Sequence, residues 1–364
     1  MRGRAQATHV NGAFCIDVSN TILVGAQQHG QITPACSFLN LCTAIGSATV
    51  PITNAHLSMQ VTVLGEALMD CLQQADGQLK PLQGGSPFNL ARACALQGVQ
   101  THYLNPLSND AFGDALKASL ERDGVGLPQL TSKLPTSLAV VQVVNGQPSY
   151  GFYREGIADR DYAVQAILSQ LTDMTPGVLH TGSLLLIPPE HLKVLAVVQG
   201  AKALGWTISM DINMRPSVAP DLPAYVHAVK LLSQEADWLK ASDEDLAVLG
   251  FASINLANAG ALSTHFPNAS RIALTCGGDG AWLQVDKHAA QASVPKVVVT
   301  DTVGAGDTFW GNCLADWTTT HAPGGPAPER VAYTLRRAMQ AAAINCTRLG
   351  CQPPNAAELN NALR

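Results

Sequence analysis

The sequence is poor in charge: only 13% of its 364 residues are Asp, Glu, Lys or Arg, and the formal net charge is -5. It has no cluster of Lys and Arg with interleaved aromatic residues, so nothing predicts a nucleic-acid-binding face. No run reaches 18 consecutive apolar residues, so no membrane-spanning helix is expected. With 47% hydrophobic residues, a chain of this length can bury a large core, as an enzyme does.

Motifs of several metal-site and enzyme classes are also missing. The 9 cysteines include no CxxC pair and the 10 histidines no HExxH, so neither a zinc site nor a disulfide framework is indicated. Scattered thiols lead us to expect reduced, packed side chains and a cytoplasmic protein. The absence of GxxxxGK[ST] excludes a Walker-type nucleotide site. Gly304-Ala305-Gly306 imitates part of a dinucleotide fingerprint, but its third glycine is missing and it lies near the C-terminus.

Residues 300–309, TDTVGAGDTF, are the most informative segment of the chain. They follow residues 296–299, KVVV, which we interpret as a strand end, and they precede apolar residues at helical spacing. Gly304 and Gly306 allow a tight turn whose N–H groups meet at a helix N-terminus, which favours a phosphate or a developing negative charge. Asp307 stands beside these donors, where it can accept a proton from an attacking hydroxyl. A plain helix entry with two turn glycines would show the same pattern.

Six motifs in order resemble those of the ribokinase-type sugar kinases. They are VTVLGEALMD (61–70), GGSPFN (84–89), SNDAFG (108–113), DINMRP (211–216), TCGGDG (275–280) and DTVGAGDTF (301–309). The resemblance covers residues 61–354. It implies an α/β fold with a central, mostly parallel sheet flanked by helices, and a small β lid.

Strand-like and helix-like segments alternate after Met59, as this fold requires. We expect strands at 61–64, 178–185, 207–211, 238–240 and 271–274, and helices at 89–96 and 111–122. Residues 138–144 and 149–153 predict a hairpin around Asn145-Gly146. By the resemblance, this hairpin and residues 78–83 form the lid.

Residues 1–58 differ from the rest of the chain. Their charged residues are Arg2, Arg4 and Asp17, and they show no sustained period of two or 3.6. We expect a poorly ordered extension, followed by one ribokinase-like domain over residues 59–364. A small separate domain is one alternative, and a targeting peptide is the other.

The resemblance assigns the sugar site to Asp70, Gly84, Gly85, Asn89 and Arg154. The glycine pair would let the lid close, and a carboxylate with a carboxamide suits a diol. Taken alone, Asp70 is also a plausible surface turn residue and Asn89 a plausible helix N-cap. Arg154 is as well explained by an exposed position on the hairpin.

The nucleotide side follows from the later motifs. The residues that the resemblance implies there are Asn213, Arg215, Thr275, Gly277, Gly280 and Asn345. An arginine offers a planar, bidentate donor for phosphate oxygens. Asn345 would face the base, although an Asn on a helix is often only a solvated side chain.

ATP and Mg²⁺ are the cofactors that the resemblance implies. The family usually carries an Asn-x-x-Glu-like segment for the metal, and here Ser242-Asp243-Glu244-Asp245 occupies its place. Asp245 stands where Glu is expected, and Glu244 is the substitute; Mg²⁺ keeps several waters, so either fits. An acidic surface loop without a metal is the alternative. The resemblance allows a monovalent cation and a homodimer without requiring either.

GEALMD, GGSPFN, DINMRP and KASDED (240–245) resemble the fructokinase branch more than the ribokinases. We therefore expect ATP-dependent phosphorylation of a sugar primary hydroxyl, with fructose as substrate. Asp307 would be the base, and the amides of Gly304, Ala305 and Gly306 would stabilise the negative charge of the phosphoryl group during transfer. The alternative is a 2-keto-3-deoxygluconate kinase, whose lid often carries a pair like Tyr153-Arg154. A sugar-binding regulatory protein on this fold is the non-enzyme alternative, but it would have no use for the base.

Overall fold

The computed structural model describes residues 7–10, 13–18, 21–26, 59–74, 76–144, 147–319 and 327–364. The chain divides into two compact units, one within residues 1–55 and one from residue 56 onward. In the first, β1 (Ala7–Val10), β2 (Ala13–Val18) and β3 (Thr21–Ala26) form an antiparallel sheet. The sequence did not predict these strands, because no sustained alternation marks them. That the segment is an extension to the larger unit stays a prediction.

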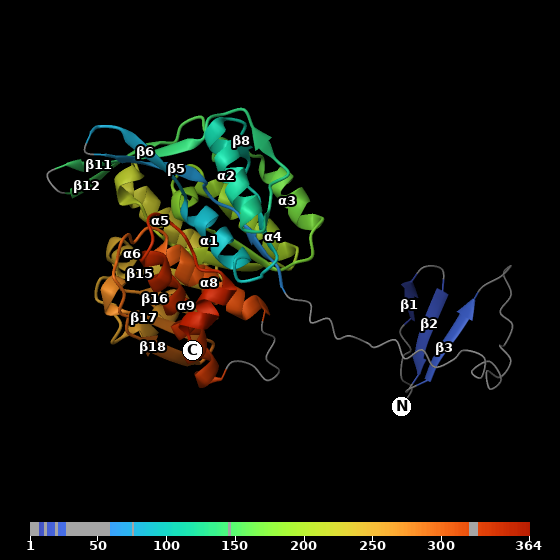
Figure 1. The fold of residues 1–364 in the computed structure, drawn as a ribbon. Coiled ribbons are helices and arrows are strands. Elements are labelled where there is room, and N and C mark those ends of the chain that lie inside the picture. Colours follow the sequence, from blue (N-terminus) through green and yellow to red (C-terminus); the bar gives the residue numbers. More distant parts are fainter. Residues whose placement is uncertain are drawn as a thin grey trace. The chain divides into compact units, whose positions relative to one another are not determined.

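A mostly parallel sheet forms the centre of the larger unit (Figure 1). Within the described residues its strands run in the order β18-β17-β16-β15-β14-β13-β4-β7-β9. The strands from β16 to β9 pair in parallel, while β17 and β18 extend one edge antiparallel. Their bounds are β4 (Val61–Val63), β7 (Thr101–Tyr103), β9 (Val125–Gly126), β13 (Val178–Gly182), β14 (Thr207–Asp211), β15 (Trp238–Ser242), β16 (Arg271–Thr275), β17 (Ala281–Val285) and β18 (His288–Ala292).

The order of these strands reverses beside β4. From β4 the chain first adds β7 and β9 on one side, and then returns to add β13 to β16 on the other. Such a reversal leaves a crevice at the carboxyl ends of the strands, where ligands bind in open α/β sheets. The two short strands β8 (Leu107–Ser108) and β10 (Thr131–Ser132) pair separately.

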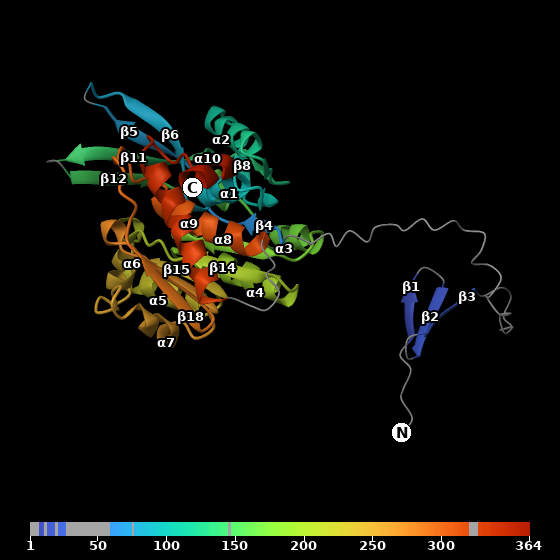
Figure 2. The same cartoon turned by 60° about the horizontal axis from the view of Figure 1, so that its bottom comes forward.

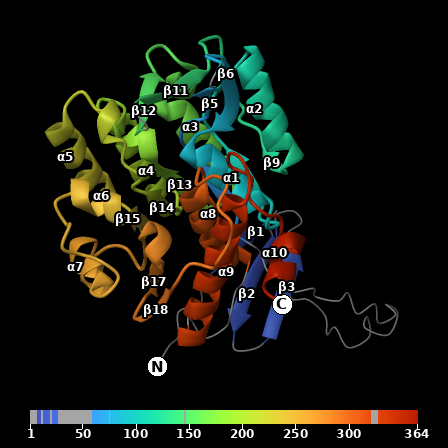
Figure 3. The ribbon, with the colours of Figure 1, turned by 60° about the vertical axis from the view of Figure 1, so that its left-hand side comes forward.

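Helices cover both faces of the sheet (Figure 3). On one face lie α3 (Val164–Thr172), α4 (His191–Ala203) and α5 (Leu222–Ser233), and on the other α1 (Ser86–Ala95), α8 (Ala305–Thr319) and α9 (Pro328–Cys346). The remaining helices are α2 (Ala111–Arg122), α6 (Asp243–Val248), α7 (Leu262–His265) and α10 (Ala356–Ala362). No described helix has both the length and the apolar composition needed to cross a membrane.

Side chains on the two faces of the central sheet contribute to two hydrophobic cores. Leu179 and Ile208 pack with α3, α4 and α5, whereas Val61, Val63 and Ala273 pack with α1, α8 and α9. Strands covered on both faces need apolar residues on both, which explains the short continuous apolar runs in the sequence. This is the α/β architecture that the family resemblance implied.

A four-stranded lid sheet lies at one end of this unit (Figures 1 and 2), in the order β12-β11-β5-β6. Its strands are β5 (Leu68–Gln73), β6 (Leu79–Gly84), β11 (Ser137–Val144) and β12 (Gln147–Tyr153). The expected hairpin strands are present as β11 and β12, and β6 covers most of residues 78–83. The Asn145-Gly146 turn lies outside the described residues.

The motif over residues 61–70 contains the predicted strand at its start and part of a second strand that the sequence did not predict. β4 ends at Val63 and β5 begins at Leu68, so Asp70 belongs to the lid sheet. The chain turns at Gly65, whose N–H donates to Asn105 Oδ1 at 2.6 Å instead of to a neighbouring strand. A Cβ at Gly65 would lie only 2.0 Å from Pro87, so this close approach requires glycine.

Other predicted boundaries are also corrected. Residues 296–299 contain no strand: β18 ends at Ala292, and Val298 and Val299 are exposed. β-branched residues favour a strand only where a partner strand is available, and here the chain has left the edge of the sheet. The strand expected over 178–185 ends at Gly182 and continues as a 3₁₀ turn. The helix expected from Asn89 already begins at Ser86.

Candidate active site

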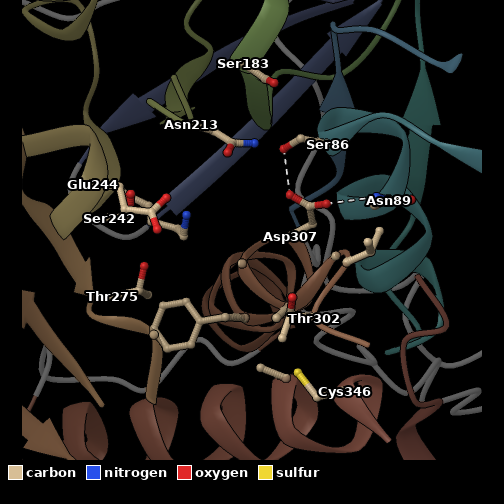
Figure 4. Close-up of a pocket in the computed structure, with 18 of the residues that line it drawn as sticks. Ser86, Asn89, Ser183, Asn213, Ser242, Glu244, Thr275, Thr302, Asp307 and Cys346 are labelled. Atoms are coloured by element: carbon tan, nitrogen blue, oxygen red, sulfur yellow. Dashed lines mark hydrogen bonds between the residues drawn. The ribbon is translucent and has the colours of Figure 1, made fainter. Parts of the chain in front are cut away.

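A cavity of about 870 Å³ opens at the carboxyl ends of the parallel strands, where the reversed strand order predicts a crevice. Its wall includes Asn213 after β14, Ser242 at the end of β15 and Thr275 at the end of β16. The lid sheet contributes Asp70. Figure 4 looks into this cavity. Asp307 lies between Ser242 and Glu244 on one side and Asn89 on the other.

The turn before α8 brings backbone donors to the cavity. Gly304 has a φ of +74°, and a Cβ there would lie 2.2 Å from Sγ of Cys351, so the turn requires glycine. α8 begins at Ala305, and the N–H of Thr308 donates to the carbonyl of Gly304. The amides before Thr308, including that of Gly306, therefore sit at the positive end of the helix dipole. This geometry suits the binding of negative charge, as the sequence predicts.

Asp307 is buried in the first turn of α8, and α1 holds both of its carboxylate oxygens. Ser86 Oγ donates to Oδ1 at 2.6 Å, and Asn89 Nδ2 donates to Oδ2 at 2.9 Å (Figure 4). Burial raises the pKa of Asp307 above its ordinary 3.8, while the hydrogen bonds from Ser86 and Asn89 oppose the shift. A carboxylate fixed in this way beside an anion-binding turn can accept the proton of a hydroxyl group.

The glycine pair lies where lid strand β6 meets α1. A Cβ on Gly84 would lie 2.1 Å from Oδ2 of Asp70, and one on Gly85, at a φ of +105°, 2.5 Å from the carbonyl of Glu66. Gly85 therefore requires glycine, whereas a side chain at Gly84 would displace the carboxylate of Asp70. Burial raises the pKa of Asp70 to about 6, against the opposing charge of Arg215. The described residues offer the Asp70 carboxylate no hydrogen bond, so it can accept one from a ligand.

Asn89 lines the cavity from the first half of α1. Its amide nitrogen is committed to Asp307, whereas its Oδ1 is buried without a partner among the described residues. This leaves Oδ1 as an acceptor for a hydroxyl group of a ligand. The alternative of an N-cap does not hold, because the residue before α1 is Gly85.

Arg154 lies behind the cavity wall, directly after β12. It is buried, so the alternative of an exposed hairpin arginine is wrong. Its Nη1 donates to the carbonyl of Leu184 at 3.4 Å, and within the described residues Nε and Nη2 have no partner. Leu184 lines the cavity and Arg154 does not. Direct contact between Arg154 and a sugar stays a prediction.

Five of the nucleotide-side residues line the cavity together: Asn213, Arg215, Thr275, Gly277 and Gly280. Asn213 has a φ of +40°, a strained conformation for a residue other than glycine. Its Oδ1 accepts a hydrogen bond from Nη1 of Arg215 at 2.7 Å, and this bond ties the two side chains together. The pair keeps a guanidinium at the wall, where phosphate oxygens can reach it.

The side-chain amide of Asn345, by contrast, forms hydrogen bonds within the protein. Its Nδ2 donates to the carbonyl of Val303 at 2.8 Å, and its Oδ1 accepts from the N–H of Gln352 at 2.8 Å. α9 thereby holds the turn before α8 and the C-terminal loop in place. Asn345 is not among the lining residues of the cavity, and its contact with a base stays a prediction.

The two acidic residues expected at a metal have different surroundings. Asp245 is buried: its Oδ1 accepts from the N–H of Met214 at 2.6 Å and its Oδ2 from that of Ser242 at 2.8 Å. Because the N–H of Asp245 also donates to Ser242 Oγ, the two residues form a capping box at the start of α6. Glu244 is exposed and lines the cavity (Figure 4).

This arrangement fits Mg²⁺ bound to a nucleotide better than a metal held by protein alone. Among the described residues, no group of three or more His, Cys, Asp or Glu side chains could hold a metal ion. Mg²⁺ keeps waters and phosphate oxygens as ligands and needs only one or two carboxylates. Asp243 and Glu244 are the carboxylates that line this part of the wall.

Sequence reasoning did not single out three polar residues of the cavity: Glu66, Ser86 and Lys240. Burial raises the pKa of Glu66 to about 7, and its Oε1 accepts from the N–H of Ser86 at 3.3 Å. A signal was present for two of them. Glu66 and Lys240 interrupt apolar segments, where a charged side chain costs free energy unless it has a partner or a role.

Comparison with known proteins agrees with this geometry. Residues 58–358 match the pfkB family of carbohydrate kinases. This chain belongs to that family. The enzyme is therefore an ATP-dependent sugar kinase, as the motifs predicted. It is 33% identical over 258 residues to a fructokinase of Rhizobium leguminosarum bv. trifolii, a match that covers 69% of this chain and 77% of the relative.

Solved structures of fructokinases share the fold. A fructokinase of Xylella fastidiosa with bound ATP is 26% identical at a TM-score of 0.72, covering 83% of this kinase and 98% of that chain. A fructokinase of Vibrio cholerae O395, solved with fructose, ADP and a calcium ion, is 25% identical at a TM-score of 0.73. The match covers 84% of this kinase and 100% of the Vibrio chain.

Proposed function

We propose that this kinase transfers the γ-phosphoryl group of ATP to a primary hydroxyl of fructose. The observation that carries the proposal is the buried carboxylate of Asp307, fixed by Ser86 and Asn89 at the start of α8. Asp70 lines the same cavity with an uncommitted carboxylate. The similarity to fructokinases from a bacterium and, at 28% identity, from Solanum habrochaites supports fructose as the sugar.

Each side of the cavity has a part in the reaction. Asp70 and the Oδ1 of Asn89 bind sugar hydroxyls and orient the attacking one toward Asp307, which accepts its proton. The raised pKa of Asp307 makes it a better base than an ordinary, solvated Asp. The amides of Gly304 and Gly306 bind the charge that spreads over the phosphoryl oxygens, and the amide of Ala305, which donates to the carbonyl of Thr302 at 3.2 Å, joins them once it leaves that partner.

The nucleotide occupies the wall formed by the ends of β14, β15 and β16. Arg215 and Asn213 bind phosphate oxygens there, and Thr275, Gly277 and Gly280 let the backbone approach the nucleotide. Glu244, with Asp243 beside it, would hold Mg²⁺, which would neutralise phosphate charge there. ATP and a calcium ion with ADP, in the fructokinases from Xylella and Vibrio, support this assignment.

The cavity favours a neutral sugar over a keto acid. A bound carboxylate needs a cation, and among the described lining residues the cations are Arg215 and Lys240. Arg215 donates to Asn213 on the nucleotide side, and Lys240 is paired with Asp211. Arg154 is buried behind the wall. Each of these three cations therefore already donates to a partner within the protein, and none is placed on the sugar side by a contact with Asp70 or Asn89.

A panel of sugars with coupled detection of ADP tests the proposal. We expect the highest kcat/KM for fructose, and a lower value for 2-keto-3-deoxygluconate. A keto acid that is the better substrate, with Arg154→Ala abolishing its turnover, would instead identify a 2-keto-3-deoxygluconate kinase. ADP formation with no sugar in the panel would leave a sugar-binding regulatory protein as the answer. The cytoplasmic location, the homodimer and a monovalent cation stay predictions.

A further inference from the structure

Lys240 is a charged residue in the middle of the central sheet. It lies in β15 between Leu239 and Ala241, and its side chain is only 4% exposed. Its Nζ lies 2.9 Å from both carboxylate oxygens of Asp211, at the end of the neighbouring strand β14. The end of the Lys240 side chain nevertheless reaches the cavity wall.

The ammonium group lies directly beside the charge-binding turn. A Cβ added to Gly306 would lie 3.2 Å from Nζ of Lys240, so the amino group occupies the space next to the first turn of α8. Lys has three N–H donors. In the described structure two of them are matched by the two oxygens of Asp211, which leaves the third for a ligand.

The charge of Lys240 persists at neutral pH. Burial alone would lower its pKa, but the carboxylates of Asp211, Asp245 and Asp307 outweigh that effect and raise the pKa above the ordinary 10.5. A buried ion pair is a poor way to gain stability, since apolar residues of similar volume often do as well. The position therefore calls for a reason besides folding.

We propose that Lys240 is a further catalytic residue, whose third N–H donates to the phosphoryl group as it passes from ATP to the sugar. This inference rests on the proposed function. The bond from the γ-phosphorus to the bridging oxygen of ADP breaks as the bond to the sugar oxygen forms. The sugar proton passes to Asp307, ADP leaves with the electron pair of the broken bond, and Lys240 keeps its protons. Asp211 holds the ammonium group in position.

The alternative is that Lys240 only neutralises Asp211. Three variants separate the two roles: Lys240→Met, Asp211→Asn, and the double variant Lys240→Met/Asp211→Asn. The double variant removes both charges and leaves neither partner buried alone. Lys202→Met, which breaks a pair with Glu235 between residues that do not line the cavity, controls for the loss of a lysine. Thermal unfolding of each full-length protein shows which variants are folded.

The first measurement is turnover with fructose and ATP. We expect Lys240→Met and the double variant to lose kcat by roughly 10²–10³, the usual effect of removing one donor to a transition-state charge. The KM for ATP should change less than threefold, because the contact forms chiefly during transfer. Recovery of kcat in the double variant to within fivefold of the wild type would show that Lys240 only neutralises Asp211.

The second measurement is binding, which does not depend on turnover. ADP with aluminium fluoride and fructose imitates the transition state of phosphoryl transfer, whereas ADP alone does not. In both Lys240 variants, affinity for the fluoride complex should fall about 100-fold relative to the wild type, while affinity for ADP alone stays within threefold. An unchanged ratio of the two affinities in the double variant would overturn the inference, whatever its kcat.

Failure of the proposed function gives a different result. A wild type that turns over another sugar but not fructose contradicts the proposed substrate, and the comparison of variants then uses that sugar. A wild type that phosphorylates no sugar contradicts both proposals. A fully active wild type with a fully active Lys240→Met contradicts this inference alone.

Discussion

The α1–α8 side of the cavity and its lid side differ in how their charges are paired. On the α1–α8 side both oxygens of Asp307 accept hydrogen bonds. On the lid side, Oε2 of Glu66, Nε and Nη2 of Arg154 and both carboxylate oxygens of Asp159 are buried without a hydrogen-bond partner among the described residues. Burial raises the pKa of Glu66 to about 7 and that of Asp159 to about 6.

This difference has a physical meaning. Leaving buried polar groups unpaired costs free energy, and a ligand that supplies the partners recovers it. On the α1–α8 side the Asp307 carboxylate is therefore already oriented by the protein alone, as electrostatic preorganisation requires. On the lid side, Glu66, Arg154 and Asp159 keep buried polar atoms without a partner among the described residues, so their charges are less completely paired.

The sharpest test of the organised side is Asp307→Asn. The variant keeps the size of the side chain but replaces one acceptor oxygen by an N–H₂ donor and removes the base, so we expect kcat to fall by roughly 10²–10⁴ with little change in KM. Steady-state kinetics with fructose measures this. Asp316→Asn, in the same helix but bonded to Arg330 and Thr334, is the control for general effects on α8. Near-full kcat in Asp307→Asn would remove Asp307 from the mechanism.

On the lid side, Asp70→Asn should act mainly on the sugar. The neutral amide accepts hydrogen bonds less strongly than the carboxylate, so we expect the KM for fructose to rise roughly tenfold, about 1.4 kcal/mol of binding. The KM for ATP should stay unchanged. Asp76→Asn, at an exposed position between β5 and β6, is the matched control. Equal losses for both substrates would show that the two sides are not separable in this way.

The smallest expected effect concerns the pH dependence of stability. The pKa of Glu66 is about 7 in the folded protein and 4.5 by its ordinary value, so between these values the folded state binds the proton more tightly. Its contribution to the free energy of unfolding is therefore fully present below pH 4.5 and is lost as the pH rises through 7.

Glu66→Gln has no proton to lose at this position. The free energy of unfolding of the variant, relative to that of the wild type, should therefore rise by roughly 1–3 kcal/mol between pH 5 and pH 8. The pKa shift of Glu66 sets the upper limit of this range. Denaturant unfolding at both pH values measures the difference. Glu155→Gln, at an exposed lid position, should show none. A constant difference between Glu66→Gln and the wild type across this range would mean that Glu66 is already ionised.

Local sequence determined a good part of this site. Gly304 and the helix that follows it, and helix α2 at its predicted bounds, could be read from the residues. The reason is that glycine freedom, helix capping and apolar spacing act within a few residues of one another. The glycine turn also indicated the role of Asp307, whereas the roles of Asp70, Gly84 and Gly85 came from the family motifs, because local physics does not explain the spacing of those motifs.

Only the tertiary structure decided which partner each charge meets. Ser86 and Asn89 hold Asp307 across more than 200 residues of chain, as the separations of 221 and 218 show. The same holds for Lys240 with Asp211, for Asn345 with Val303, and for Asp70, which stands in the lid sheet. The burial and pairing of a charge depend on elements that fold together from distant parts of the chain, so no local pattern could specify them.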